Sequence, residues 1–368
     1  MITVNIPEVS IGSVINDVAD MACFCIEQGR PLSDLPSVCL WSMPGIGKSS
    51  GAGQIAELIT QRTGKRMELR DIRLTTCQPT DLTGIPYSNE AHTETVWLTP
   101  ELFAESEDGP YGYVFLFDEI DKTSPAVQAA ALQLILDRKC WTHELPPNSI
   151  VLAAGNYKAF GSEKEVKMTV ELSNRFTHYF IAPDFESFRS YAVRKRLHPY
   201  VLGYLSYDNS KLCVNDPEKE MLSFPTPRSW ERVSSLLYMN GERDIRGIHA
   251  RIAGTIGSGT AMEFEQWIRV YRSLPPVEEI FRGNRPSYPA KHDVLYALIS
   301  SMTAYAGSRE EEISVEELRC ACRYAGRFPA DFSALFFVNL CEFKKIRQKL
   351  LAVQEFEAWR RNNPGYME

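Results

Sequence analysis

The sequence predicts an α/β fold with a mostly parallel sheet, followed by a helical region. Short apolar runs alternate with helical segments as far as Pro183, and the first of these runs leads into a glycine-rich loop. After Pro183 helical spacing dominates. Strands that alternate with helices indicate a parallel sheet covered by helices. We therefore expect an α/β core at residues 1–183 and an α-helical region at 184–368.

The elements of the first region follow from periodicity and from residues that start or stop helices. Residues 10–29 have amphipathic helical spacing that ends near Gly29, and 50–62 also have helical spacing. A further helix is expected at 124–137, because Ser124 can cap it and Pro125 suits its first turn. The predicted strands are residues 37–41, 67–74, 113–117, 149–155 and 178–182.

The second region has no predicted strand. The segment at 273–289 is rich in proline and is expected to be a connection, and Ser314 and Glu317 have the spacing of a capping box. The predicted helices are residues 184–197, 227–239, 244–257, 260–273, 290–305, 314–325 and 330–361.

Composition limits the class of protein. The 368 residues are 44% hydrophobic and 24% charged, with a formal net charge of −7. These shares are typical of soluble globular proteins, and an acidic chain is a poor candidate for bulk binding to nucleic acid. No run approaches the ~18 apolar residues of a membrane span, and the start lacks the pattern of a signal peptide. The nine cysteines include no C-x-x-C pair, which favours reduced thiols and a cytoplasmic location.

The stretch from about Gln78 to Gly112 lacks clear periodicity. It carries several prolines and glycines together with Tyr87, Trp97 and Phe103. Long irregular segments within compact domains are often functional. A surface excursion that packs on its own hydrophobic residues is the alternative interpretation.

The segment "LWSMPGIGKSSG" at 40–51 resembles a phosphate-binding loop. Against the pattern G-x-x-x-x-G-K-[ST], only the first position differs, where Ser42 replaces glycine. We expect this serine to be tolerated without a catalytic role. An apolar strand precedes the loop and a helix follows it, which is the context that such a loop requires. The candidate nucleotide-binding residues are Pro44, Gly45, Ile46, Gly47, Lys48, Ser49 and Ser50.

Each part of this loop has a physical task. Gly45 and Gly47 let backbone N–H groups turn toward phosphate oxygens. Lys48 brings a positive charge to the outer phosphates, and we expect its side chain to face solvent. Ser49 can place a hydroxyl on Mg²⁺.

Two further strand ends carry polar groups suited to hydrolysis. The run "YVFLFDEIDK" ends in Asp118 and Glu119, and because successive strand residues point to opposite faces, the two carboxylates are expected to address different spaces. Asp118 would hold Mg²⁺ and Glu119 the attacking water. The strand "VLAAGN" ends at Asn156, whose amide can orient that water.

The order of "PGIGKSS", "LFDEIDK", "AAGN", "LSNRF" and "TPRSW" resembles AAA+ ATPases, and within them the MoxR-like group. The resemblance covers roughly residues 10–240. It implies a AAA+ P-loop NTPase core with a five-stranded, mostly parallel sheet between helices, followed by an α-helical lid. It also implies a homo-oligomeric ring, usually hexameric, with ATP and Mg²⁺ between neighbouring subunits.

The same resemblance assigns roles to single residues. Lys48 and Ser49 match the Walker A motif, Asp118 and Glu119 match Walker B, and Asn156 matches sensor 1. Arg175 resembles an arginine finger that reaches the γ-phosphate of a neighbouring subunit; a surface salt bridge is the alternative. Arg228 resembles sensor 2, and a cation at a helix start suits a nearby anion; the alternative is an ordinary surface residue.

The resemblance also implies a class of function. MoxR-like proteins carry an insertion before Walker B that tends to face a substrate or partner, which suits 78–112, and residues 137–152 resemble the hairpin that precedes sensor 1. The first hypothesis is a chaperone-like ATPase that remodels a protein partner, typically paired with a von Willebrand factor A domain protein. One alternative is a ring that gates an effector in a defence or mobile-element system. A second is a nucleic-acid motor, which the acidic net charge disfavours. A third is a nucleotide-binding scaffold without turnover, which the presence of Glu119 disfavours.

Overall fold

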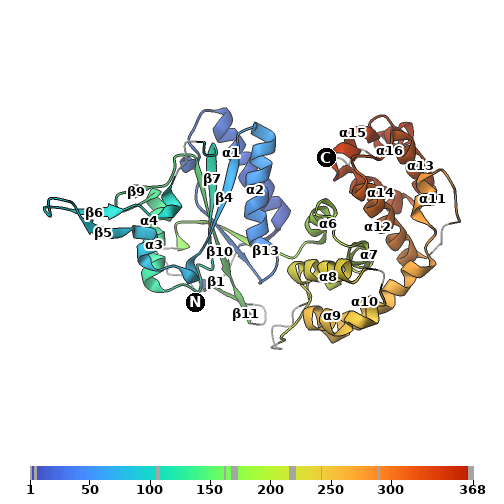
Figure 1. Ribbon diagram of the computed structural model, residues 1–368, viewed down its shortest axis with the longest axis horizontal. Helices are drawn as coiled ribbons and strands as arrows, with labels where there is room; N and C mark the ends of the chain where they lie inside the picture. The colour runs from blue at the N-terminus through green and yellow to red at the C-terminus, as the bar shows by residue number, and fades with distance from the viewer. Residues whose placement is uncertain are drawn as a thin grey trace. The chain divides into compact units, whose positions relative to one another are not determined.

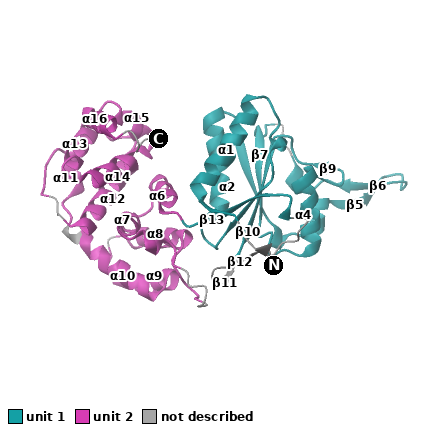
Figure 2. Cartoon of the chain, turned by 180° about the vertical axis from the view of Figure 1, so that it is seen from behind, with its two compact units in different colours: residues 1–183 teal, residues 184–368 magenta. Residues whose placement is uncertain are grey.

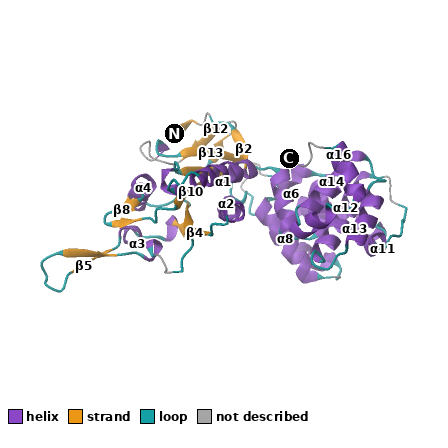
Figure 3. Cartoon of the chain, turned by 90° about the horizontal axis from the view of Figure 1, so that it is seen from above, coloured by secondary structure: helices purple, strands orange, loops and turns teal. Residues whose placement is uncertain are grey.

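In the computed structural model, the polypeptide forms two compact units, Met1–Pro183 and Asp184–Glu368 (Figure 2). The first unit holds the sheets and the second is helical (Figure 3). The described residues are 2–3, 6–104, 108–160, 163–166, 173–214, 221–241, 243–287 and 291–363.

The centre of unit 1 is a six-stranded sheet in the order β2-β13-β3-β10-β7-β4, in which every neighbouring pair is parallel. The expected fold class is confirmed. Five strands correspond to predicted runs, and the short β2 is an additional edge strand beside β13. The strands are β2 (Glu8–Ser10), β3 (Val38–Ser42), β4 (Met67–Arg73), β7 (Gly112–Asp118), β10 (Ser149–Asn156) and β13 (Thr177–Ala182).

Helices cover both faces of this sheet (Figure 1). The helices α1 (Ile11–Glu27) and α2 (Lys48–Thr63) lie together on one face, while α3 (Pro79–Thr83) and α4 (Pro125–Asp137) lie on the other. Alternate strand residues supply the two layers of core. Phe115 and Phe117 belong to the cluster on the α4 side, together with Trp41. Ser124 caps α4 as expected, accepting a hydrogen bond from the Val127 N–H group.

The irregular segment at 78–112 contains a hairpin that the sequence pattern did not predict. β5 (Ile85–Ser88) and β6 (Thr95–Leu98) pair antiparallel and form a separate two-stranded sheet. This β5–β6 arm, residues 85–98, extends away from the central sheet (Figures 1 and 3). A second small hairpin, β8 (Lys139–Cys140) with β9 (His143–Glu144), follows α4.

Three more short strands form a sheet of their own, in the order β1-β12-β11, with antiparallel pairs. Their bounds are β1 (Ile2–Thr3), β11 (Lys158–Phe160) and β12 (Glu163–Val166).

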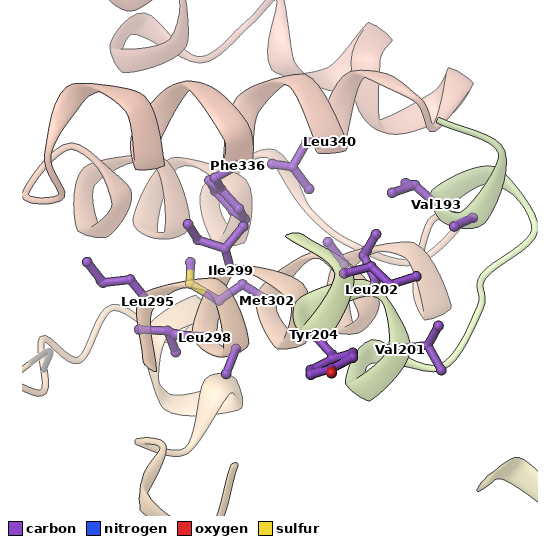
Figure 4. Close-up of a cluster of buried hydrophobic side chains, with 14 of the residues drawn as sticks. Val193, Val201, Leu202, Tyr204, Leu295, Leu298, Ile299, Met302, Phe336 and Leu340 are labelled. Carbon is purple, nitrogen blue, oxygen red and sulfur yellow. The ribbon is translucent and has the colours of Figure 1, made fainter. Parts of the chain in front are cut away.

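Unit 2 consists of helices and turns in its described residues. Their buried side chains form a continuous hydrophobic core, part of which is drawn in Figure 4 around Leu202, Met302 and Phe336. The helices are α6 (Phe185–Arg194), α7 (Pro199–Tyr207), α8 (Pro227–Asn240), α9 (His249–Ile256), α10 (Ser258–Ile268), α11 (Val277–Phe281), α12 (His292–Ser308), α13 (Val315–Ala325), α14 (Ala330–Cys341), α15 (Lys344–Leu350) and α16 (Gln354–Asn362).

The helical pattern differs from the prediction at several points. α7 and α11 were not predicted, and the single helix expected at 330–361 is three helices. The first break falls at Phe343, whose backbone is extended and whose ring packs on Gly307. A Cβ atom at Gly307 would lie 2.3 Å from that ring. The capping box of Ser314 and Glu317 is present at the start of α13.

Candidate nucleotide site

The glycine-rich loop connects the end of β3 to the start of α2. Gly45 and Gly47 have φ angles of 83° and 109°, in the region that side chains disfavour. The left-handed Gly47 directly precedes Lys48, the first residue of α2. A Cβ atom at Gly47 would meet no atom within 4 Å, so open space lies beside it. The loop and the helix N-terminus together form the kind of site that binds an anion.

Lys48 is buried, with 9% of its surface exposed, so the expectation that it faces solvent was wrong. Its ammonium donates hydrogen bonds to Asn156 Oδ1 at 2.8 Å and to Ser42 Oγ at 2.9 Å. Ser42 is itself fully buried, and its hydroxyl donates to the Met43 carbonyl at 2.8 Å. Ser42 is therefore more than a tolerated replacement for glycine, because it supplies an acceptor that holds the lysine.

Ser49, in the first turn of α2, lies beside Asp118, at the carboxyl end of β7. The Ser49 hydroxyl donates to Asp118 Oδ2 at 3.2 Å. A hydroxyl and a carboxylate are hard oxygen donors, and this pair fits Mg²⁺, which is commonly held by one or two protein groups plus phosphates and water. Across the described residues, no group of three or more His, Cys, Asp or Glu side chains could hold a metal ion.

Glu119 lies in a turn rather than in the strand. β7 ends at Asp118, and Glu119 has a left-handed backbone with φ 59°. This conformation is uncommon for residues other than glycine and is often found at functional sites. A turn, and not strand alternation, therefore separates the two carboxylates. The Glu119 N–H group donates to Asp118 Oδ1 at 2.8 Å, which ties the turn to the strand end.

The Glu119 carboxylate is held in its ionised form. Thr75 donates a hydrogen bond to its Oε2 at 2.6 Å, and Lys122 lies 3.7 Å from its Oε1. The hydrogen bond from Thr75 lowers the pKa of Glu119, and the positive charges of Lys122 and Arg73 act in the same direction against the effect of burial. The carboxylate can therefore act as a proton acceptor at neutral pH.

Asn156 is positioned by its neighbours on the sheet. Its strand pairs directly with β3, with Asn156 opposite Ser42. Its N–H group donates to Asp121 Oδ1 at 3.1 Å, and the Ile120 N–H group donates to the Ala154 carbonyl at 3.1 Å. The acidic turn after β7 is thus bonded to the end of β10.

The structure brings five of the candidate residues to one end of the sheet: Lys48, Ser49, Asp118, Glu119 and Asn156. Arg175 is elsewhere. It precedes β13, whose first residue Thr177 pairs with Val38 at the start of β3, so this exposed arginine lies at the amino-terminal end of the strands, opposite the loop end. Arg228 is exposed in the first turn of α8, in unit 2.

Three residues near the site were not predicted. Thr75 binds Glu119, Asp121 binds the Asn156 backbone, and Ser42 accepts from Lys48. Asp121 is visible within "DEID", but nothing in its spacing distinguishes it from a solvated turn residue. Thr75 follows β4, and only the parallel pairing of β4 with β7 brings it near Glu119.

Comparison with known proteins agrees with this geometry. Residues 37–172 match the family model described as "AAA domain (dynein-related subfamily)". This segment contains the glycine-rich loop, both acidic residues and Asn156. No curated protein matches the sequence.

Three solved structures with a similar arrangement are distant in sequence. A RuvB mutant from Thermotoga maritima is 14% identical, with a TM-score of 0.39 over 85% of this chain and 90% of that one. PCH-2 from C. elegans is 13% identical, with a TM-score of 0.32 over 81% and 68%. Hsp104 in its closed state is 16% identical, with a TM-score of 0.35 over 70% and 46%. Scores this low carry no information about substrate or partner.

The α/β unit therefore has the fold of a AAA+ P-loop NTPase core, and the match of residues 37–172 to the AAA domain model supports ATP hydrolase activity. The match to the AAA domain model implies ATP as the bound nucleotide, and the loop geometry suits its phosphates. None of the described helices is long and apolar enough to cross a membrane.

Proposed function

We propose that the protein is an oligomeric ATPase of the MoxR-like type, which hydrolyses ATP at subunit interfaces and uses it to remodel a protein partner. The observation that carries the proposal is the position of Arg175. β3 runs from the end of the sheet near Arg175 to the phosphate loop, and its five residues span about 17 Å at roughly 3.3 Å each. An arginine at that end of the strands can complete a site on a neighbouring subunit.

The residues at the loop end of the sheet have complementary roles in this proposal. Lys48 would turn from Asn156 toward the outer phosphates, and Ser49 and Asp118 would hold Mg²⁺. When bound, Mg²⁺ supplies positive charge to the phosphate oxygens. Glu119 would accept the proton of the attacking water, and Asn156, once released by Lys48, would orient that water. Phosphoryl transfer of this kind depends on positioning and charge.

The Arg175 guanidinium would neutralise charge on the γ-phosphate of the neighbouring subunit, and Arg228 would contribute from the helical lid. Because the first of these contacts exists only between subunits, hydrolysis would depend on assembly. We propose a ring, by the resemblance a hexamer, that acts as a chaperone for a protein partner. A von Willebrand factor A domain protein is the partner type that the resemblance implies. All nine cysteines are free thiols, which suits a cytoplasmic location.

Mixing of two inactive variants tests the proposal. Arg175→Ala subunits keep a complete binding face, and Lys48→Met subunits keep a complete arginine finger. Each variant alone should hydrolyse ATP poorly. Loss of the arginine finger should lower the turnover number by roughly 10³–10⁵-fold. A mixed assembly contains junctions with both halves intact, so activity should return on mixing and fall again on dilution.

The matched control pairs Arg175→Ala with the double variant Lys48→Met/Arg175→Ala. No finger remains in this mixture, so it should stay inactive. Full activity of Arg175→Ala alone, or a rate per subunit that is independent of dilution, would contradict the proposal. Stimulation of the wild-type rate by DNA or RNA would favour the nucleic-acid motor instead.

A further inference from the structure

One face of the β5–β6 arm is apolar and exposed. In the antiparallel register, Ile85 lies opposite Leu98 and Tyr87 lies opposite Val96. Directly opposed residues, and residues two apart on one strand, share a face. These four side chains therefore form a single surface, which we call the arm face. Their exposed fractions are 58% for Ile85, 63% for Tyr87, 48% for Val96 and 53% for Leu98.

On the opposite face of the arm, a side chain contacts the rest of the protein. Trp97, between Val96 and Leu98, points away from the arm face and stacks on Trp141 in the turn of the β8–β9 hairpin, with ring centroids 5.0 Å apart. Trp141 has a left-handed backbone, with φ 53°. An isolated two-stranded hairpin is only marginally stable, so this stack supports the arm and leaves its other face uncovered.

The tip of the arm is also well organised. Asn89 accepts hydrogen bonds from the N–H groups of Thr93 and Glu94 at 3.0 and 3.4 Å, and its own N–H group donates to the Glu94 carbonyl at 3.0 Å. These hydrogen bonds order the turn between β5 and β6, so the arm has a defined conformation. Four exposed apolar side chains on one such surface indicate a site of interaction.

The charge of the segment indicates the chemistry of the partner. Residues 74–121 contain no lysine or arginine. Glu90 and Glu94 lie at the tip of the arm and Glu101 just beyond its base, and all three are exposed. In the adjoining β8–β9 hairpin, Lys139 lies opposite Glu144 in the strand register, so residues of opposite charge are neighbours there. The arm face is therefore an apolar surface with an acidic border.

We propose that the arm face is the docking surface for the protein partner, and that it binds a polypeptide segment with apolar side chains flanked by lysine or arginine. The inference rests on the proposed function, since it names the chemistry of the partner to be remodelled. Apolar contacts supply the affinity, and opposite charge at the border supplies specificity and speeds encounter. A second copy of this chain fits less well, because two arm faces brought together would also bring Glu90 and Glu94 near their counterparts.

Peptide binding to the full chain tests the inference. The probe is a fluorescein-labelled twelve-residue peptide of alternating valine and lysine, measured by fluorescence anisotropy without nucleotide. Two control peptides replace valine by serine or lysine by glutamate. We expect the valine–lysine peptide to bind, both controls to bind at least tenfold more weakly, and added salt to weaken binding.

Variants of the arm locate the site. Tyr87→Ser and Leu98→Ser should each raise the Kd about tenfold, whereas Met262→Ser, at a residue of unit 2 that is 56% exposed, should leave it unchanged. Glu90→Lys with Glu94→Lys should transfer the preference to the glutamate peptide. Near-ultraviolet circular dichroism of the Trp97–Trp141 pair reports whether the arm remains folded.

Several results would overturn the inference. One is a Tyr87→Ser variant that keeps a folded arm and binds the valine–lysine peptide as tightly as the wild type. Another is a serine peptide that binds the wild type as tightly as the valine–lysine peptide. The third is self-association of the wild type, measured by sedimentation, that Tyr87→Ser abolishes. The Lys48→Met variant should bind the peptide normally, and Tyr87→Ser should keep the basal ATPase rate. Loss of docking with intact ATPase activity and subunit mixing would therefore reject the docking surface and leave the ATPase proposal standing.

Discussion

The Lys48 ammonium donates a hydrogen bond to the Asn156 amide oxygen over 2.8 Å, and so joins the start of α2 to the end of β10. The same ammonium is bound by Ser42, and both acceptors belong to neighbouring parallel strands. Lys48, which is proposed to bind phosphate, is therefore hydrogen-bonded to Asn156, which is proposed to orient the attacking water. Arrival of a phosphate would compete for the lysine and release the Asn156 side chain for its own role.

Lys48→Met should abolish ATP binding while the protein stays folded. Methionine fills the space of the buried aliphatic stem but lacks the charge. Binding of a fluorescent ATP analogue should weaken by at least about 100-fold, because a charge-assisted contact with phosphate is lost. Lys48→Ala should bind as poorly and have a lower melting temperature, since truncation leaves a cavity at a site that is 9% exposed. If Lys48→Met bound the ATP analogue with wild-type affinity, Lys48 would not contribute to nucleotide binding.

Ser42→Ala and Ser42→Gly together separate the hydroxyl from the backbone. If the hydroxyl holds Lys48, both variants should bind ATP about tenfold more weakly, since a hydrogen bond to a charged group contributes about 1.5–3 kcal/mol. If only backbone freedom matters, Ser42→Gly should differ from the wild type and Ser42→Ala should not. Titration calorimetry with ATP measures both. Wild-type affinity in Ser42→Ala would show that the contact has no functional weight.

Glu119→Gln should bind ATP and turn it over slowly. The amide preserves the size of the side chain but cannot accept a proton from water, so the turnover number should fall by roughly 10²–10⁴-fold. Asp118→Asn is the informative comparison, because it should weaken Mg²⁺ dependence and nucleotide binding together. Steady-state hydrolysis and nucleotide binding distinguish the two variants. Near-normal turnover in Glu119→Gln would place the proton acceptor elsewhere.

Thr75→Val should move the acid limb of the pH–rate profile to higher pH. The hydrogen bond from Thr75 is the main cause of the lowered pKa of Glu119. The ionised carboxylate is the active form, and it is lost as pH falls through that pKa, so a variant with a higher pKa loses activity earlier on acidification. Valine preserves the shape of threonine without its hydroxyl. A limb that stays in place would show that Glu119 does not control it.

His198→Asn should remove part of the acid sensitivity of unit 2. His198 caps α7 by accepting the Tyr200 N–H group, and burial lowers its pKa from 6.5 to about 4. Between these values the unfolded chain binds a proton that the folded chain does not, so stability falls as pH drops from 6.5 toward 4. The loss reaches about 3 kcal/mol at most. Asparagine retains a capping acceptor without titrating, so denaturant unfolding of this variant should depend less on pH in that window. An unchanged pH dependence would contradict the assignment.

Much of the fold could be predicted because its signals are local. The apolar runs of β3, β7 and β10 are buried on both faces and bounded by polar residues. This pattern is typical of strands in a parallel sheet that helices cover on both sides. Ser124 and Ser314 mark helix starts through bonds to residues three positions away. The glycine-rich loop was visible because its chemistry depends on consecutive residues.

Other features depend on contacts between distant residues. Phe343 interrupts a helical pattern because its ring packs on Gly307, and no local breaker marks the position. Ile85, Tyr87, Val96 and Leu98 resemble buried strand residues, yet the hairpin exposes them. Periodicity reports which residues share a face and not whether anything covers that face.

The sequence by itself therefore determined the α/β class, five of the six strands of the central sheet, and the chemistry of the phosphate loop, since each is encoded within a few consecutive residues. Only the tertiary structure decided that Lys48 is buried against Ser42 and Asn156, that Thr75 holds Glu119, and that Arg175 lies at the opposite end of the strands from the loop. These relations depend on which strands become neighbours. Strand order is set by the packing of the whole unit, because many weak apolar contacts must be buried at once before any one pairing is favoured.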